Sequence, residues 1–112
     1  MPQYAILLYM PTPDEPSDMP PAELEAHLRY DERVKELGGK TGPAIALAPS
    51  STATTIRGDA VTDGPFLEAK EVLGGAFVLE ARDLDHAIRI ARECPSTWRG
   101  SVEIRPLIGI QE

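Results

Sequence analysis

The order of helical and β-type segments constrains the fold of this chain more than any other feature. Two amphipathic segments predict helices at residues 22–37 and 84–93. Strands are predicted around them, at residues 3–10, 41–48, 51–57, 72–81 and 101–107. This order predicts an α+β domain, a ferredoxin-like antiparallel sheet with both helices on one face. Because the opposite face would then lack a helix cover, we expect a homodimer.

Proline, glycine and short acidic side chains set the boundaries of these segments. The stretch PTPDEPSDMPP at residues 11–21 predicts a loop, because proline fits neither a helix interior nor a paired strand. Asp18 is the candidate cap of the first helix, and Gly38-Gly39 is a typical helix end. A tight turn near Pro49-Ser50 is expected between the second and third strands, and Asp83 should cap the second helix.

Length and charge limit the functions that this chain can have. One domain covering residues 1–112 is expected, because no linker divides the chain. Its 11 basic and 18 acidic residues give a formal charge of −7, which argues against direct binding to nucleic acid or to an anionic membrane. No apolar run approaches the ~18–20 residues of a membrane span, and no basic stretch precedes the first apolar segment. A cytoplasmic location is therefore expected.

The sequence contains no pattern typical of a metal or cofactor site. Cys94 is the single cysteine, so an internal disulfide is impossible and the usual zinc-ligand spacing is missing. No glycine-rich loop has the context of a phosphate or dinucleotide site. We therefore expect no cofactor and no metal. Cys94 is interpreted as a small buried hydrophobe, and His86 as a solvated surface histidine.

The first predicted helix carries an unusual pair of side chains. At about 100° per residue, its apolar side chains fall on one broad arc, which holds Leu24, Leu28, Tyr30, Val34 and Leu37. His27 and Asp31 fall inside the same arc and are four residues apart, so their side chains can touch. One interpretation is catalytic, with His27 as an acid or base that Asp31 orients. The other is a structural pair at the rim of the core or at a subunit contact.

The last predicted strand separates apolar from charged side chains. Alternation places Val102 and Ile104 on one face and Glu103 and Arg105 on the other. If the apolar pair packs against the helices, Glu103 and Arg105 line the uncovered face, and Arg57 from its own strand is expected to join them. Such a face can bind a polar ligand or form a salt-bridge network between subunits.

A charged turn precedes the fourth predicted strand. Asp63-Gly64-Pro65 is a strong turn signal, with Phe66 as the expected anchor in the core. Three charged residues follow, and together with the charged sheet face they complete the candidate ligand-binding set. The members of that set are Arg57, Asp63, Glu68, Lys70, Glu71, Glu103 and Arg105.

Residues 62–80, TDGPFLEAKEVLGGAFVLE, resemble the signature of the DGPF group within the YCII-related domain family. Other segments resemble that family in order and spacing: the opening YAILLY strand, the helix ending in Gly-Gly, the TTIRG strand, the LDHAIRIA helix and the closing VEIRPL strand. The resemblance covers nearly the whole chain. It implies a dimeric α+β barrel, in which two ferredoxin-like sheets pack face to face.

The same resemblance implies little about chemistry. Some family members occur alongside sigma-factor regions, which implies a regulatory association. Relatives of the YCII type resemble a His–Asp enzyme, and His27 falls where their helix histidine would. Their acid lies near the end of the second helix, where this chain has Glu93-Cys94-Pro95, so Asp31 is a partner inferred from helix phase alone.

Two functions from different classes follow. The first is a homodimer with a cleft for a small polar ligand or substrate beside His27 and Asp31, whether or not it turns that molecule over. The second is a non-catalytic dimeric binding or regulatory module associated with sigma-factor-type partners. The sequence does not decide whether the chain is an enzyme.

Overall fold

The structure is a computed structural model and describes residues 1–14, 19–65 and 70–109. Two α-helices, six strands and two short 3₁₀ helices make up the described part. In chain order they are β1 (Gln3–Pro11), α1 (Pro21–Glu36), β2 (Lys40–Ala46), η2 (Ser50–Thr52), β3 (Thr54–Arg57), β4 (Ala60–Asp63), β5 (Glu71–Glu80), α2 (Leu84–Ala91), η3 (Pro95–Trp98) and β6 (Ser101–Pro106).

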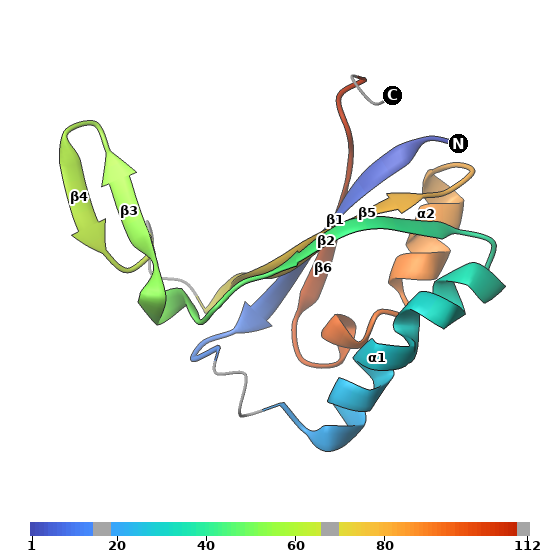
Figure 1. Ribbon diagram of the computed structural model, residues 1–112, viewed down its shortest axis with the longest axis horizontal. Helices are drawn as coiled ribbons and strands as arrows, with labels where there is room; N and C mark the ends of the chain where they lie inside the picture. The colour runs from blue at the N-terminus through green and yellow to red at the C-terminus, as the bar shows by residue number, and fades with distance from the viewer. Residues whose placement is uncertain (15–18, 66–69, 110–112) are drawn as a thin grey trace.

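A four-stranded antiparallel sheet with the order β2-β5-β1-β6 forms the body of the molecule. The helices α1 and α2 lie together on one side of it (Figure 1). Neighbouring strands in space are not consecutive in the chain, because each helix carries the chain from one strand to another. The predicted ferredoxin-like α+β arrangement is confirmed. Neither helix in the described part is long and apolar enough to cross a membrane.

The two faces of the sheet differ in burial. Tyr4 and Ile6 of β1 are buried against the helices, whereas Ala5 and Leu7, which alternate with them, are only half-buried. Directly paired residues of neighbouring strands share a face. The strand registers therefore define a helix-free face, made by the side chains of Ala5, Leu7, Tyr9, Ala76, Val78, Glu103 and Arg105. The strand β1 is therefore buried on the side toward the helices and only half-buried on the other.

The core lies between the sheet and the two helices. Val34 and Ile90 are fully buried there, one from each helix, against Ile6 and Leu79 of the sheet. Cys94 is also buried, as predicted. Val102 and Ile104 of β6 pack against this core, so the predicted division of the last strand into an apolar and a charged face is confirmed.

Local signals explain the ends of the elements. The Asp83 carboxylate accepts a hydrogen bond from the His86 backbone N–H at 2.8 Å, which confirms the predicted cap of α2. Pro20 stands at the cap position of α1 without a side-chain hydrogen bond, and the predicted cap Asp18 lies outside the described residues. After α1 the chain turns at Gly38, whose φ of 86° is left-handed.

His86 is buried, so its interpretation as a surface histidine is wrong. Only 3% of the residue is exposed. Its Nδ1 accepts a hydrogen bond from the Arg82 backbone N–H at 3.0 Å, so Nε2 carries the proton and donates it to the Leu37 carbonyl at 2.7 Å. The imidazole thereby joins the start of α2 to the end of α1.

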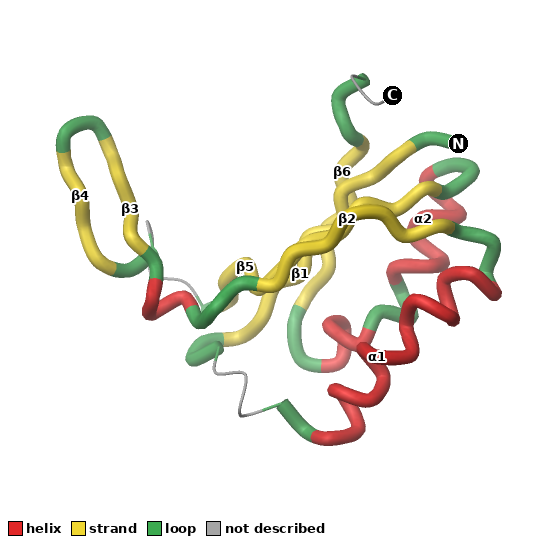
Figure 2. Tube along the Cα trace, viewed as in Figure 1, coloured by secondary structure: helices red, strands yellow, loops and turns green. Residues whose placement is uncertain are grey.

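The strands β3 and β4 form a separate two-stranded hairpin, which we call the arm (Thr54–Asp63). It projects away from the four-stranded sheet (Figures 1 and 2). The predicted pairing of this region is wrong, because the strand at 54–57 turns at Gly58-Asp59 and pairs with residues 60–63 instead of 41–48. The segment η2 stands in place of the predicted tight turn.

Candidate functional site

A pocket of about 370 Å³ opens between α1 and the sheet. Apolar side chains form most of its lining, and His27, Arg99 and Asp14 contribute the charged and titratable groups. Small-molecule sites are commonly concave and apolar with few polar groups, and this pocket has that composition. The full lining is Leu8, Met10, Pro11, Asp14, Met19, Leu24, His27, Ile45, Ala46, Leu47, Gly74, Gly75, Ser96 and Arg99.

Beneath the pocket lies a buried ion pair. Glu23, in the first turn of α1, has a side chain that is only 2% exposed. Arg99, which follows η3, donates from Nε and Nη2 to the two Glu23 oxygens at 2.7 and 2.9 Å. This fork-shaped geometry satisfies a buried carboxylate well. Hydrogen bonding to Arg99 therefore outweighs burial and holds the pKa of Glu23 below its usual value.

His27 lies one helical turn after Glu23. Its Nε2 is 3.9 Å from Glu23 Oε2, and its side chain is 27% exposed. Burial lowers the pKa of His27 from its ordinary 6.5; the negative charge of Glu23 opposes this shift and the positive charge of Arg99 adds to it. The imidazole is therefore neutral at pH 7, and one of its nitrogens can accept a proton.

This geometry limits what His27 can do as a base. A distance of 3.9 Å is too long for a direct hydrogen bond, so Glu23 acts on His27 through its charge alone. Both Glu23 oxygens are already bonded to Arg99. The charge of Glu23 would stabilise a protonated His27 only in part. His27 is therefore suited to reversible proton exchange with a bound molecule, and less suited to act as a strongly activated base.

Asp31 makes other contacts. Its carboxylate accepts a hydrogen bond from the Thr41 hydroxyl of β2 and lies 3.7 Å from Lys35 Nζ. The Asp31 side chain is 56% exposed. Among the described residues, the carboxylate found within 4.0 Å of a His27 nitrogen is that of Glu23. Asp31 thus ties α1 to the neighbouring strand, and Glu23 occupies the place beside His27 that the sequence assigned to Asp31.

The structure gathers three of the predicted ligand-binding residues on or beside the helix-free face. Glu103 accepts a hydrogen bond from the Tyr9 hydroxyl at 3.0 Å, and that bond raises the pKa of Tyr9. Glu71 accepts from the Ser101 hydroxyl at 2.8 and 3.0 Å, and Arg105 pairs in register with Ala5. These side chains lie on the face away from α1, so they do not line the pocket beside His27.

The other predicted ligand-binding residues lie elsewhere. Arg57 and Asp63 belong to the arm, so the expectation that Arg57 joins Glu103 and Arg105 on one sheet is wrong. Lys70 precedes β5, and its backbone carbonyl accepts a hydrogen bond from the Thr12 N–H at 2.8 Å. Glu68, like the expected anchor Phe66, lies outside the described residues.

Asp14 connects the pocket to the base of the arm. Its carboxylate accepts hydrogen bonds from the Ser50 N–H at 2.8 Å and the Ser50 hydroxyl at 2.6 Å. Ser50 begins η2, which leads directly into β3. Burial raises the pKa of Asp14, but the hydrogen bonds to its carboxylate together outweigh burial, so the pKa lies below its ordinary value. The carboxylate therefore stays charged and fixes the wall of the pocket to the connection that carries the arm.

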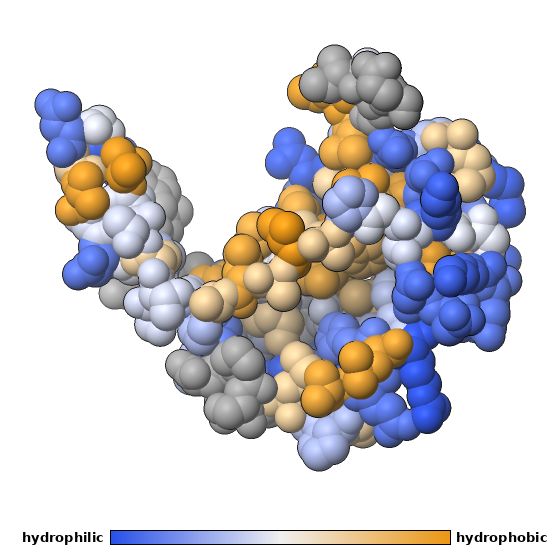
Figure 3. Space-filling model, viewed as in Figure 1, coloured by the Kyte–Doolittle hydropathy of each residue, from blue (hydrophilic) through white to orange (hydrophobic). Residues whose placement is uncertain are grey.

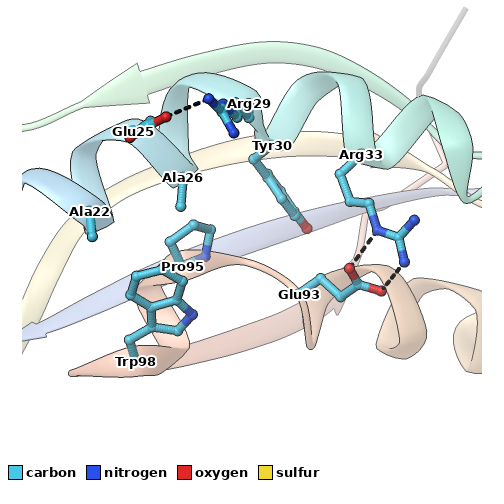
Figure 4. Close-up of a pocket in the computed structure, with 9 residues that line it drawn as sticks. All are labelled: Ala22, Glu25, Ala26, Arg29, Tyr30, Arg33, Glu93, Pro95 and Trp98. Carbon is cyan, nitrogen blue, oxygen red and sulfur yellow. Dashed lines mark hydrogen bonds and ion pairs between the residues drawn. The ribbon is translucent and has the colours of Figure 1, made fainter.

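A second groove, of about 380 Å³, lies on the other side of α1 (Figure 4). Trp98 and Pro95 form one wall, and Arg29 and Arg33 project from α1 above them. Both arginines are already ion-paired, Arg29 with Glu25 and Arg33 with Glu93, so neither guanidinium is held ready for a ligand. Across the described residues, no cluster of three metal-ligating side chains occurs.

Glu23 and Arg99 were not among the site residues predicted from the sequence. A signal for Glu23 was present, because the same helix phase that selected His27 puts Glu23 on the apolar arc, four residues earlier. Arg99 gave no comparable signal, since only the folded chain brings it to α1.

Comparison with known proteins identifies the family of this chain. The model of the YCII-related domain matches residues 3–111. This chain belongs to the YCII-related domain family. An uncharacterized protein of Rhizobium meliloti (strain 1021) is 44% identical to this YCII-related domain over an alignment of 77 residues, and the match covers 62% of the chain and 60% of that protein. The likeness therefore spans less than two thirds of the relative's length.

Proposed function

We propose that this YCII-related domain binds a small molecule in the pocket beside His27 and exchanges a proton with it. The observation that carries the proposal is a partly enclosed imidazole in a largely apolar pocket, 3.9 Å from a buried carboxylate that is fully paired with Arg99. Proton exchange needs a group that is uncharged near pH 7 and accessible, and His27 meets both conditions.

The pocket lining favours a particular chemical class. Leu24, Met10 and Leu47 favour an apolar body, whereas His27 favours one polar group that can give up or accept a proton. The charge of Arg99 is balanced by Glu23, so a fully charged head group gains little there. We therefore propose a weakly acidic ligand such as a phenol or an enolisable carbonyl compound, rather than a strong acid.

The homodimer is the second part of the proposal. The helix-free face carries Ala5, Leu7 and Val78, which no helix or strand of the described part covers, and a second copy would bury them in the manner of a dimeric α+β barrel. Tyr9 and Glu103 would then lie near the interface. The compartment proposed for this dimer is the cytoplasm.

A non-catalytic module is the alternative that one observation favours. Because Arg99 occupies both oxygens of Glu23, no acid among the described residues is hydrogen-bonded to His27 to raise its basicity. Ligand binding without turnover is compatible with that arrangement, and so is a regulatory role beside a sigma-factor-type partner.

Calorimetry with phenol and benzoate tests the pocket. A proton that passes between the phenol and His27 stays inside the complex, so its transfer is followed by the ultraviolet absorption that distinguishes phenolate from phenol, while calorimetry measures the affinity. We expect phenol to bind with proton exchange, His27→Gln to abolish that exchange, and benzoate to bind more weakly. Arg29→Gln, in the second groove, is the matched control and should change neither result. Saturable phenol binding that is unchanged in His27→Gln would overturn the proposal, as would the lack of any saturable binding.

A further inference from the structure

The arm is the part of the described structure that packs least against the rest of the chain. Its side chains are exposed apart from the half-buried Thr55. Ile56 and Val61 are direct cross-strand partners on one face of the hairpin, and they are 72% and 64% exposed. A lone two-stranded hairpin is at best marginally stable in water. An apolar pair on such a hairpin calls for a surface against which it can pack.

The base of the arm is well fixed. The Gly64 N–H donates to the Ala53 carbonyl at 2.6 Å, and the Thr55 hydroxyl donates to the Gly64 carbonyl at 2.7 Å. Asp14 holds Ser50 on the other side of this base. The arm therefore leaves the body in a set direction, which lowers the entropic cost of docking it.

The whole chain exposes more surface than a compact monomer does. Its accessible surface is 7633 Å² for a mass of 12.2 kDa, whereas a compact monomer of that mass exposes about 6,100 Å². Its radius of gyration is 15.2 Å, against about 13 Å for a compact chain of this length. The excess surface, roughly 1,500 Å², is larger than the ~800 Å² that each partner contributes to a standard interface.

We infer that the arm is a clasp, which packs its Ile56–Val61 face against a second copy of this chain. The arm rises on the side of the sheet opposite the helices, so a copy seated on the helix-free face lies beside it (Figure 1). Figure 3 shows apolar surface on the arm across a hollow from apolar surface on the body. In a two-fold dimer, the arm of each copy packs against the other copy, so the same contact occurs twice.

Apolar side chains near the base of the arm form a surface against which the apolar face of the partner's arm can pack. Ile45 and Leu47, on and just after β2, also contribute to the lining of the pocket beside His27, and they are 60% and 44% exposed. Ile45 pairs in register with Ala76 of the helix-free face, so this apolar surface is continuous with that face. The inference rests on the proposed homodimer and extends it, because it assigns the arm a share of the interface.

Sedimentation equilibrium of the full chain tests the clasp. The test variant is Ile56→Ser with Val61→Ser. The control is Ala60→Ser with Thr62→Ser, because these positions lie on the opposite face of the same hairpin. We expect the test variant to raise the dimer dissociation constant at least tenfold, and the control to leave it within about twofold. Equal dissociation constants for test and control variants overturn the clasp.

Hydrogen exchange of the wild-type chain provides a second measurement that needs no variant. The amides of residues 54–63 should become more protected as the concentration rises through the dimer dissociation constant. A dimer whose arm amides stay unprotected overturns the clasp and leaves the homodimer standing, whereas a monomer at 100 µM overturns both. Phenol binding at His27 is measured in a separate experiment, so a failure of the proposed pocket can be told apart from a failure of the clasp or of the homodimer.

Discussion

Glu23 and Arg99 meet across 76 positions of the sequence and close the floor of the pocket with two hydrogen bonds of 2.7 and 2.9 Å. Glu23 belongs to α1, and Arg99 lies between η3 and β6. The pair therefore fastens the first turn of α1 to the connection between η3 and β6. It also sets the charge that His27 experiences.

The two substitutions that break this ion pair, Arg99→Gln and Glu23→Gln, should lower the free energy of unfolding by different amounts. Arg99→Gln leaves the buried Glu23 carboxylate without its charged partner, and we expect a loss of about 3 kcal/mol in the free energy of unfolding. Glu23→Gln leaves an arginine that is partly exposed, so the loss should be nearer 1 kcal/mol. Urea denaturation measures both values. Glu25→Gln, on the exposed side of α1, is the control and should stay within about 0.5 kcal/mol.

The same pair predicts a pH dependence of stability. The pKa of Glu23 is lower in the folded chain than its ordinary value of 4.5, so the ionised carboxylate favours the folded state. That contribution is complete above pH 4.5 and is lost as the pH falls from there through the folded-state pKa. The free energy of unfolding between pH 3 and 6 should therefore fall less steeply toward acid in Glu23→Gln than in wild type. Parallel curves for the two proteins would contradict the assignment.

The order of elements was predictable because each strand and helix carries its own periodic pattern and stop signals. Asp83 and Gly38 lie where those signals predicted a helix start and a helix end. The arm was missed although Gly58-Asp59 is a two-residue hairpin signal between β-branched segments. The sequence analysis paired the strand before that turn with residues 41–48 and gave none to residues 60–63.

The candidate site was predictable only in part. Helix phase placed His27 on the face toward the sheet, where it lines the pocket. Phase alone could not show that Thr41 bonds Asp31, or that Arg99 reaches Glu23, because both contacts depend on tertiary packing. It also placed Leu24 and Leu28 in the core, yet they are 53% and 76% exposed.

Removing the buried imidazole of His86 should loosen the join between the two helices. In His86→Ala the Leu37 carbonyl loses its donor and the Arg82 N–H loses its acceptor, both in part-buried surroundings. We expect a loss of about 2–3 kcal/mol in the free energy of unfolding. Asp85→Ala, an exposed change in the same turn of α2, is the control. Thermal or urea unfolding measures the difference, and a loss no larger than that of the control would refute the role of His86.

The pH at which His27 becomes protonated tests the environment of the pocket most directly. Because burial lowers its pKa below the ordinary 6.5, an NMR titration should show the His27 ring signal moving at a lower pH than that of a histidine in an unstructured peptide. Glu23→Gln should lower the midpoint further, since the Glu23 charge favours the protonated ring and Arg99 then acts unopposed. His27→Gln assigns the signal by removing it. A wild-type midpoint at or above 6.5 would mean that the imidazole is solvated rather than enclosed, and an unchanged midpoint in Glu23→Gln would mean that Glu23 does not act on it.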